Sequence, residues 1–108
     1  LVRQYIEEHY AENIMLQNLV QTSHLSGFHL IRLFRNTVGV PPHVFLKQVR
    51  IRRASQFIAQ GMTLAEAAQT AGFVDQSHFT RQFKQITGIT PRQYSNSIQY
   101  GVASHTII

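Results

Sequence analysis

The chain has 108 residues, 44% of them hydrophobic, which is enough for one domain or for two very small ones that share a core. Its 10 Lys and Arg residues outnumber its 5 Asp and Glu residues, so the formal net charge is +5. It contains no cysteine, which excludes disulfides, cysteine nucleophiles and cysteine-ligated zinc and is compatible with a cytoplasmic location. No apolar run reaches the roughly 18 residues that a membrane helix needs.

A positive charge favours polyanions such as nucleic acid or an anionic membrane, although charge alone fits a merely basic soluble domain equally well. The chain begins with Leu1 rather than Met, so we expect it to be part of a longer protein.

Helical periodicity runs through almost the whole chain, and no segment alternates convincingly as a strand would. The predicted fold class is therefore all-α. We expect seven helices, over 2–11, 15–22, 27–38, 43–60, 64–71 and 76–87, with a last short helix whose first residue is Pro91.

Four helix starts carry a side chain that can cap backbone amides. These are Ser26, Thr63 (with Glu66 three residues on, as in a capping box), Asp75 and Thr90. The spacing also predicts the inward side chains of the third and sixth helices, which are Leu30, Leu33 and Phe34 in one and Phe79, Phe83 and Ile86 in the other.

The two halves of the chain repeat each other. Leu30, Phe34, Gly39, Pro42 and Phe45 match Phe79, Phe83, Gly88, Pro91 and Tyr94, each 49 residues later. His29 and Arg32 match His78 and Arg81 at the same offset, whereas Thr22 matches Thr70 at 48, so the second turn is one residue longer. Each half reads as a helix-turn-helix unit. We predict a first subdomain over 1–41, a linker helix over 42–61, a second subdomain over 62–100 and a tail over 101–108.

The length of the linker suits duplex DNA. A helix of about 18 residues spans about 27 Å, and successive major grooves on one face of DNA lie ~34 Å apart. The longer helices of the two units could therefore enter adjacent major grooves. A duplicated helical unit with no nucleic-acid role is the alternative.

Residues near the start of the second helix of such a unit meet the bases. In the first unit the outward positions are Gly27, Phe28, Ile31, Arg32 and Arg35. Arg32 can bind guanine through two hydrogen bonds. Phe28 and Ile31 suit thymine methyl groups, or else they pack against a neighbouring helix.

In the second unit the outward residues are Gln76, Ser77, Thr80, Arg81 and Lys84. Gln76 suits adenine and Arg81 suits guanine. Because Arg32 and Arg81 occupy the same repeat position, base contact is favoured for both.

Other positions suit the DNA backbone. The candidates are the side chains of Arg35, Lys84 and Arg92 and the backbone amides at helix starts near Leu16, Leu64 and Gln93. Lys47, Arg52 and Arg53 on the linker are more simply explained as a solvated face.

We predict no catalytic residues, no metal site and no cofactor, and therefore no enzyme. None of the six histidines forms a recognised zinc spacing, and no nucleophile motif, phosphate-binding loop or placed pair of carboxylates is present. His29 and His78 occupy equivalent repeat positions, so packing or DNA backbone contact is favoured over metal binding.

The stretch GFVDQSHFTRQFKQITGITPRQY resembles the C-terminal signature of the AraC/XylS family of bacterial transcription regulators. The matching residues are Gly72, Phe73, Ser77, Phe79, Arg81, Phe83, Lys84, Gly88, Pro91 and Tyr94. Upstream, Ser26, Leu30, Phe34, Gly39, Pro42, Phe45, Arg50 and Ala54 match as well. The resemblance covers about residues 2–95.

The resemblance implies a seven-helix domain with two motifs that binds double-stranded promoter DNA, and usually an activator that contacts RNA polymerase. Its base-reading positions fall on Phe28, Ile31 and Arg32 and on Gln76, Ser77, Thr80 and Arg81. Many members carry a separate domain that binds an effector and dimerises, which we expect to be missing here. The alternative function is a helical protein–protein module with an acidic partner. RNA is less favoured, because its A-form major groove is too narrow for a helix.

Three positions in the first motif depart from the family pattern. Val20 stands where alanine is common and where its repeat partner Ala68 conforms, so it could open the angle between the two helices. His24 replaces the glycine seen at Gly72, which makes a less regular turn, and Met15 replaces a hydroxyl cap. We hypothesise that the first motif binds less specifically than the second.

Overall fold

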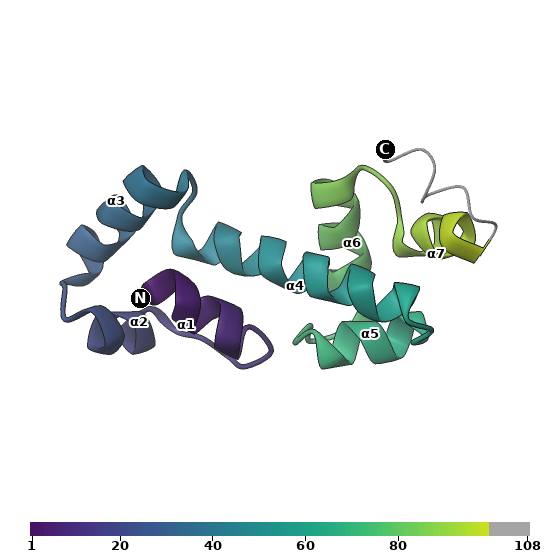
Figure 1. Cartoon of the computed structure of the whole chain (residues 1–108), viewed down its shortest axis with the longest axis horizontal. Coiled ribbons are helices and arrows are strands. Elements are labelled where there is room, and N and C mark those ends of the chain that lie inside the picture. The colour runs from purple at the N-terminus through teal and green to yellow at the C-terminus, as the bar shows by residue number, and fades with distance from the viewer. Residues whose placement is uncertain (100–108) are drawn as a thin grey trace. The chain divides into compact units, whose positions relative to one another are not determined.

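The computed structural model describes residues 1–99, which form seven α-helices and no strand (Figure 1). The helices are α1 (Val2–His9), α2 (Leu16–Ser23), α3 (Gly27–Val38), α4 (Pro42–Ala59), α5 (Leu64–Thr70), α6 (Gln76–Thr87) and α7 (Pro91–Gln99). The expected helices are all present, with their observed bounds close to those predicted. Within residues 1–99 no helix combines the length and the apolar character needed to cross a bilayer. The predicted tail, 101–108, lies outside the described residues.

The chain divides into two compact units, Leu1–Arg50 and Ile51–Ile108, and the division falls inside α4. The first half of α4 therefore belongs to the first unit and the second half to the second unit. The sequence repeat explains this arrangement. Pro42 and Phe45 of α4 occupy in the first unit the positions that Pro91 and Tyr94 of α7 occupy in the second.

Each helix of the first unit contributes to one apolar core. The buried residues are Ile6 of α1, Leu19 of α2, Leu30 and Phe34 of α3, and Phe45 and Val49 of α4. The rings of Phe34 and Phe45 meet edge to face, with centroids 5.6 Å apart. This contact joins α3 to the start of α4 across the short connection that Gly39 begins.

The core of the second unit is built around a row of aromatic rings. Phe73 contacts Phe79 at 5.0 Å between centroids, Phe79 contacts Phe83 at 5.6 Å, and Phe83 contacts Tyr94 of α7 at 5.6 Å. The remaining buried apolar residues are Ile51, Ala54, Ile58, Ala67, Ala68 and Ala71. The buried residues of α5 are Ala67 and Ala68. Because these side chains are small, the α5 backbone can pack close to the rest of the core.

The predicted caps are confirmed. Ser26 Oγ accepts from the His29 amide at 3.3 Å, and Asp75 Oδ1 accepts from the His78 amide at 2.7 Å. Thr63 and Glu66 form the reciprocal capping box, at 3.1 and 3.0 Å. Thr90 and Gln93 form another, at 3.1 and 2.8 Å.

The prediction of burial is wrong for two residues. Leu33 is 56% exposed and Ile86 is 42% exposed. In α3 the buried stripe consists of Leu30 and Phe34, and Leu33 instead borders an open apolar groove of about 420 Å³ between α3 and the start of α1. In α6 the third buried position belongs to Gln82, which is 8% exposed and whose Nε2 lies 2.9 Å from Nε2 of His78.

Candidate nucleic-acid interface

In the first motif the start of α3 packs closely against side chains of α2. A Cβ added at Gly27 would lie 3.2 Å from Cδ2 of Leu16, so Gly27 rests against α2 and does not face outward as expected. His24 closes α2 in the left-handed region, with φ of 61°, and its amide donates to the Val20 carbonyl at 2.9 Å. A non-glycine residue pays a conformational cost for that backbone geometry.

The start of α2 has only one of the two hydrogen bonds of a capping box. Met15 has no hydroxyl to offer, but Asn18 Oδ1 accepts from the Met15 amide at 2.8 Å. This is the return half of a capping box, and Glu66 and Gln93 make the same bond at the starts of α5 and α7. The departure at Met15 therefore leaves half of the cap in place.

The turn of the second motif has glycine where the first has histidine. Gly72 has φ of 99°, and the amides of Gly72 and Phe73 donate to carbonyls of α5 at 3.1 and 3.0 Å. Asp75 then starts α6. Both motifs thus deliver their second helix through a left-handed residue followed by a side-chain cap.

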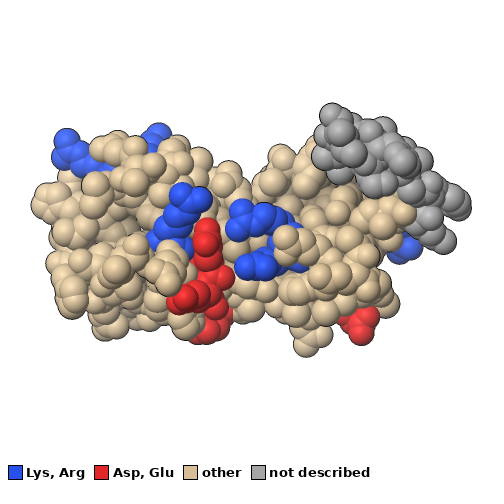
Figure 2. Space-filling model, viewed as in Figure 1, with Lys and Arg blue, Asp and Glu red and all other residues tan. Residues whose placement is uncertain are grey.

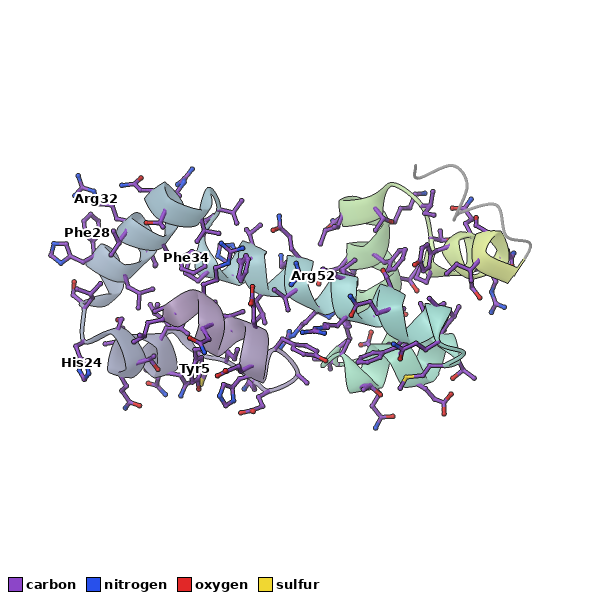
Figure 3. The ribbon with its side chains drawn as sticks, viewed as in Figure 1. Tyr5, His24, Phe28, Arg32, Phe34 and Arg52 are labelled. Carbon is purple, nitrogen blue, oxygen red and sulfur yellow. The ribbon has the colours of Figure 1, made fainter. Side chains whose placement is uncertain are left out.

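The first turns of α3 present the residues predicted to read bases in the first motif. Phe28 is 71% exposed, Ile31 is 38% exposed, and Arg32 and Arg35 are exposed as well. The Arg32 guanidinium lies over the Phe28 ring, with its carbon 5.9 Å from the centroid. Figure 3 shows both side chains on the same side of α3, pointing away from the helices of the first unit. The alternative that Phe28 packs against a neighbouring helix does not hold.

The first turns of α6 bring together all four residues predicted for the second motif. Gln76, Ser77, Thr80 and Arg81 are exposed and together line one open hollow. Their amide, hydroxyl and guanidinium groups can match hydrogen-bonding base edges. Lys84 is also exposed and follows one turn later.

Sequence reasoning missed one neighbour of Arg32. Asn36 lines a shallow hollow on α3 together with Arg32 and His29, and it is exposed. Its place four residues after Arg32 was the available signal, because residues at that spacing share a helix face.

The residues predicted for the DNA backbone occupy several helix ends. Arg92 is exposed in the first turn of α7. Leu16 and Leu64 are the first residues of α2 and α5, where amides have no acceptor within the helix. The Gln93 amide already donates to Thr90 Oγ1 at 3.1 Å, so its side chain and amide are both engaged in the cap.

Negative charge is kept off both second helices, since neither α3 nor α6 contains Asp or Glu. In Figure 2 the acidic side chains on the visible face of the first unit gather over α1 and the loop after it. At the start of α5, the backbone hydrogen bond from Thr63 lowers the pKa of Glu66, so this carboxylate stays charged. Among residues 1–99, no three His, Asp or Glu side chains gather as a metal site would require.

Two short helix pairs of this geometry, each with an exposed second helix, place the chain in the class of helix-turn-helix proteins. A family model for a helix-turn-helix domain matches residues 19–97. The Bacillus subtilis protein called uncharacterized HTH-type transcriptional regulator YbfI is 40% identical over 78 residues, which make up 72% of this chain and 28% of that protein.

Solved structures of regulatory proteins have a similar fold. The C-terminal domain of the response regulator yesN from Fusobacterium nucleatum superposes with a TM-score of 0.80 at 30% identity, covering 87% of this chain and 93% of that one. The DNA-binding domain of AdpA, solved in complex with a target DNA, has a TM-score of 0.86 at 22% identity, covers 92% of this chain and 90% of its own, and shows the likeness of fold.

The chain belongs to the AraC-type family of helix-turn-helix domains, the DNA-binding domains of transcription regulators. It spans between 28% and 45% of the length of the first curated relatives that it matches.

Proposed function

We propose that this domain binds double-stranded DNA sequence-specifically, with α3 and α6 as the two recognition helices in adjacent major grooves. The observation that carries the proposal is the repeated arginine. Arg32 and Arg81 stand exposed at the same position of two helix-turn-helix motifs, each on an acid-free helix. An exposed arginine in the first turns of such a helix can hold guanine O6 and N7 together.

The remaining base contacts follow from the chemistry of the exposed side chains. On α6, the amide of Gln76 pairs with adenine, and the hydroxyls of Ser77 and Thr80 can serve either kind of base edge. On α3, Phe28 and Ile31 contact thymine methyl groups.

Phosphate contacts position the two helices without carrying sequence information. Arg35 and Lys84 lie beyond the reading residues of α3 and α6, and Arg92 lies at the start of α7. The amides at Leu16 and Leu64 add the positive ends of helix dipoles, whereas the Gln93 amide is engaged in its cap and leaves only the dipole at the start of α7 to attract a phosphate. With a net charge of +5, we expect binding to weaken steeply as salt rises.

In the whole protein, the role that fits this domain is promoter binding by a regulator that activates transcription through RNA polymerase. The names of relatives support a regulatory role: YbfI is called a transcriptional regulator, and AdaA of Bacillus subtilis is called a bifunctional transcriptional activator/DNA repair enzyme. An effector-binding or dimerisation domain elsewhere in the protein is part of this proposal.

The test is selection of the domain against a random pool of duplexes about 30 base pairs long, followed by sequencing of the retained DNA. Two enriched elements about one helical turn apart support reading by both motifs. A single element supports reading by one motif alone. No enrichment, together with retention that does not respond to salt, contradicts DNA binding and favours an acidic protein partner.

Point variants then assign the elements to the motifs. Arg32→Ala is expected to relax one element and Arg81→Ala the other, each by about 1–3 kcal/mol of base discrimination. Arg52→Ala is the matched control, because Arg52 is an exposed arginine on α4, outside both recognition helices. If Arg52→Ala relaxed an element as much as the other two, the assignment would be wrong.

A further inference from the structure

Phe28 and Arg32 form a pre-arranged pair on the reading side of α3 (Figure 3). The ring is 71% exposed and lies beneath the guanidinium, whose carbon is 5.9 Å from the centroid. The ring also meets the His29 imidazole edge to face, with centroids 6.1 Å apart. That imidazole is held in turn by Ser26, with Oγ 2.9 Å from Nδ1. Phe28 therefore has two neighbouring side chains, Arg32 and His29, while most of its surface faces solvent.

The second motif repeats the arginine but not the ring. Ser77 and Arg81 have the same four-residue spacing on α6, and both are exposed. The two motifs thus share the guanine-binding group and differ in the group one turn before it. One presents about the largest apolar surface that a side chain offers, and the other presents a hydroxyl.

The apolar group that a base pair offers in the major groove is the C5-methyl of a pyrimidine. Thymine carries this methyl, and 5-methylcytosine carries the same methyl at the same atom. A base edge without it leaves the exposed ring against water or against the N4 donor of cytosine, which the ring cannot pair with. Phe28 precedes Arg32 by four residues, about 6 Å along the helix axis, and the Arg32 guanidinium lies over its ring. The methyl group that the ring contacts is therefore expected on a base pair next to the guanine that Arg32 binds.

We infer that the first motif reads a C5-methylated pyrimidine beside a guanine, so that it accepts 5-methylcytosine as well as thymine and responds to cytosine methylation of its site. The second motif, with Ser77 in place of the ring, does not respond to the methyl. This inference rests on the proposed function, and it adds methylated duplex DNA as a distinct class of ligand.

The test uses the operator found by selection, with the pyrimidine beside the guanine of the first element varied chemically. Two comparisons each change one methyl group and nothing else: thymine against uracil, both paired with adenine, and 5-methylcytosine against cytosine, both paired with guanine. The same two comparisons at the second element serve as the internal control. Affinities are measured by fluorescence anisotropy at one fixed salt concentration.

In both comparisons at the first element, the methylated duplex is expected to bind about fourfold tighter, which is the worth of one buried methyl group (about 0.8 kcal/mol). The ratio is expected to be close to one at the second element. Phe28→Ser, which copies the second motif, should bring the first ratio to one. Ser77→Phe, the reciprocal change, should create a methyl preference at the second element.

A ratio of one at the first element, or a ratio that survives Phe28→Ser, overturns the inference while the selected operator still stands. So does a first element that lacks a pyrimidine beside the guanine. Failure to select any operator contradicts the proposed function itself. Phe28→Ser is expected to fold, since the ring is exposed, and circular dichroism with a melting curve checks this.

Discussion

The Arg50 guanidinium donates a hydrogen bond from Nε to the carbonyl oxygen of Tyr10 at 2.7 Å. Its Nη2 donates to the carbonyl oxygen of Glu12 at 2.8 Å. One side chain of α4 thereby satisfies two carbonyls in the loop between α1 and α2. Burial of the guanidinium lowers the pKa of Arg50. Because this loop leads directly to α2, Arg50 helps to fix where the first motif begins.

Arg50→Met keeps most of the side-chain volume but leaves both carbonyls without their donor. We expect the free energy of unfolding to fall by about 1–3 kcal/mol, measured by urea denaturation. The control is Arg52→Met, which removes an exposed arginine from the same helix and should change stability by less than about 0.5 kcal/mol. Equal effects of the two changes would show that the loop bonds contribute nothing.

His24 holds a backbone conformation that glycine adopts without strain. With φ of 61°, His24→Gly should relieve part of the roughly 1–2 kcal/mol cost of the left-handed region, less the extra chain entropy of glycine. We expect the free energy of unfolding, measured by thermal denaturation, to rise by up to about 1 kcal/mol. The opposite change, Gly72→Ala in the second turn, should destabilise, since φ there is 99°. A loss of stability in His24→Gly would contradict the strain argument.

Three side chains accept a hydrogen bond from the amide three residues before them at a helix start: Asn18, Glu66 and Gln93. Of these only Glu66 is charged. Its carboxylate sits at the start of α5, where we propose that the Leu64 amide meets a phosphate. Glu66→Gln keeps the hydrogen bond to Thr63 and removes the repulsion, so we expect tighter DNA binding with a steeper salt dependence. Gln93→Glu is the reciprocal variant and should weaken binding. The same affinity in all three proteins would exclude phosphates near both helix starts.

The same carboxylate makes stability depend on pH. The amide and hydroxyl of Thr63 lower the pKa of Glu66 from 4.5 in the folded state, so the folded state releases its proton more readily than the unfolded state. Its contribution is therefore full above pH 4.5 and is lost as the pH falls through the lowered pKa. Melting curves of Glu66→Gln should lose less stability than the native domain between about pH 5 and 3. Parallel losses would show that other carboxylates carry the acid sensitivity.

The two motifs are expected to differ in specificity. The first has a strained turn at His24 and an incomplete cap at Met15, whereas the second has Gly72 and a full box at Thr63. Arg81→Ala should therefore cost more base discrimination than Arg32→Ala, within the range of about 1–3 kcal/mol for one guanine contact. Competition with duplexes mutated at each element measures both. If Arg32→Ala costs as much as Arg81→Ala, the hypothesis of a weaker first motif is wrong.

Helices, caps and the internal repeat could be predicted from the sequence because their causes are local. A cap such as Thr63 with Glu66, or a stop such as Gly88, acts within one turn of the helix, so the residues that decide the element lie inside it. The exposed residues of α3 and α6 that we propose read bases were predicted from the same periodicity. Their exposure is the consequence of burying Leu30 and Phe34 on one stripe and Phe79 and Phe83 on the other.

Burial at position 33 and its repeat partner 82 was decided only by the tertiary structure. The sequence by itself predicted an inward leucine in the first motif and said nothing of a buried glutamine in the second. In the structure Leu33 is 56% exposed beside an open groove, and Gln82 is 8% exposed with His78 at 2.9 Å. The hydrogen bonds from Arg50 to the loop were also decided by the tertiary structure, because each joins two residues that are 40 or 38 positions apart in the sequence. Periodicity reports which side of a helix a residue occupies, whereas burial also depends on which neighbour covers that side, and the neighbour is set by distant parts of the chain.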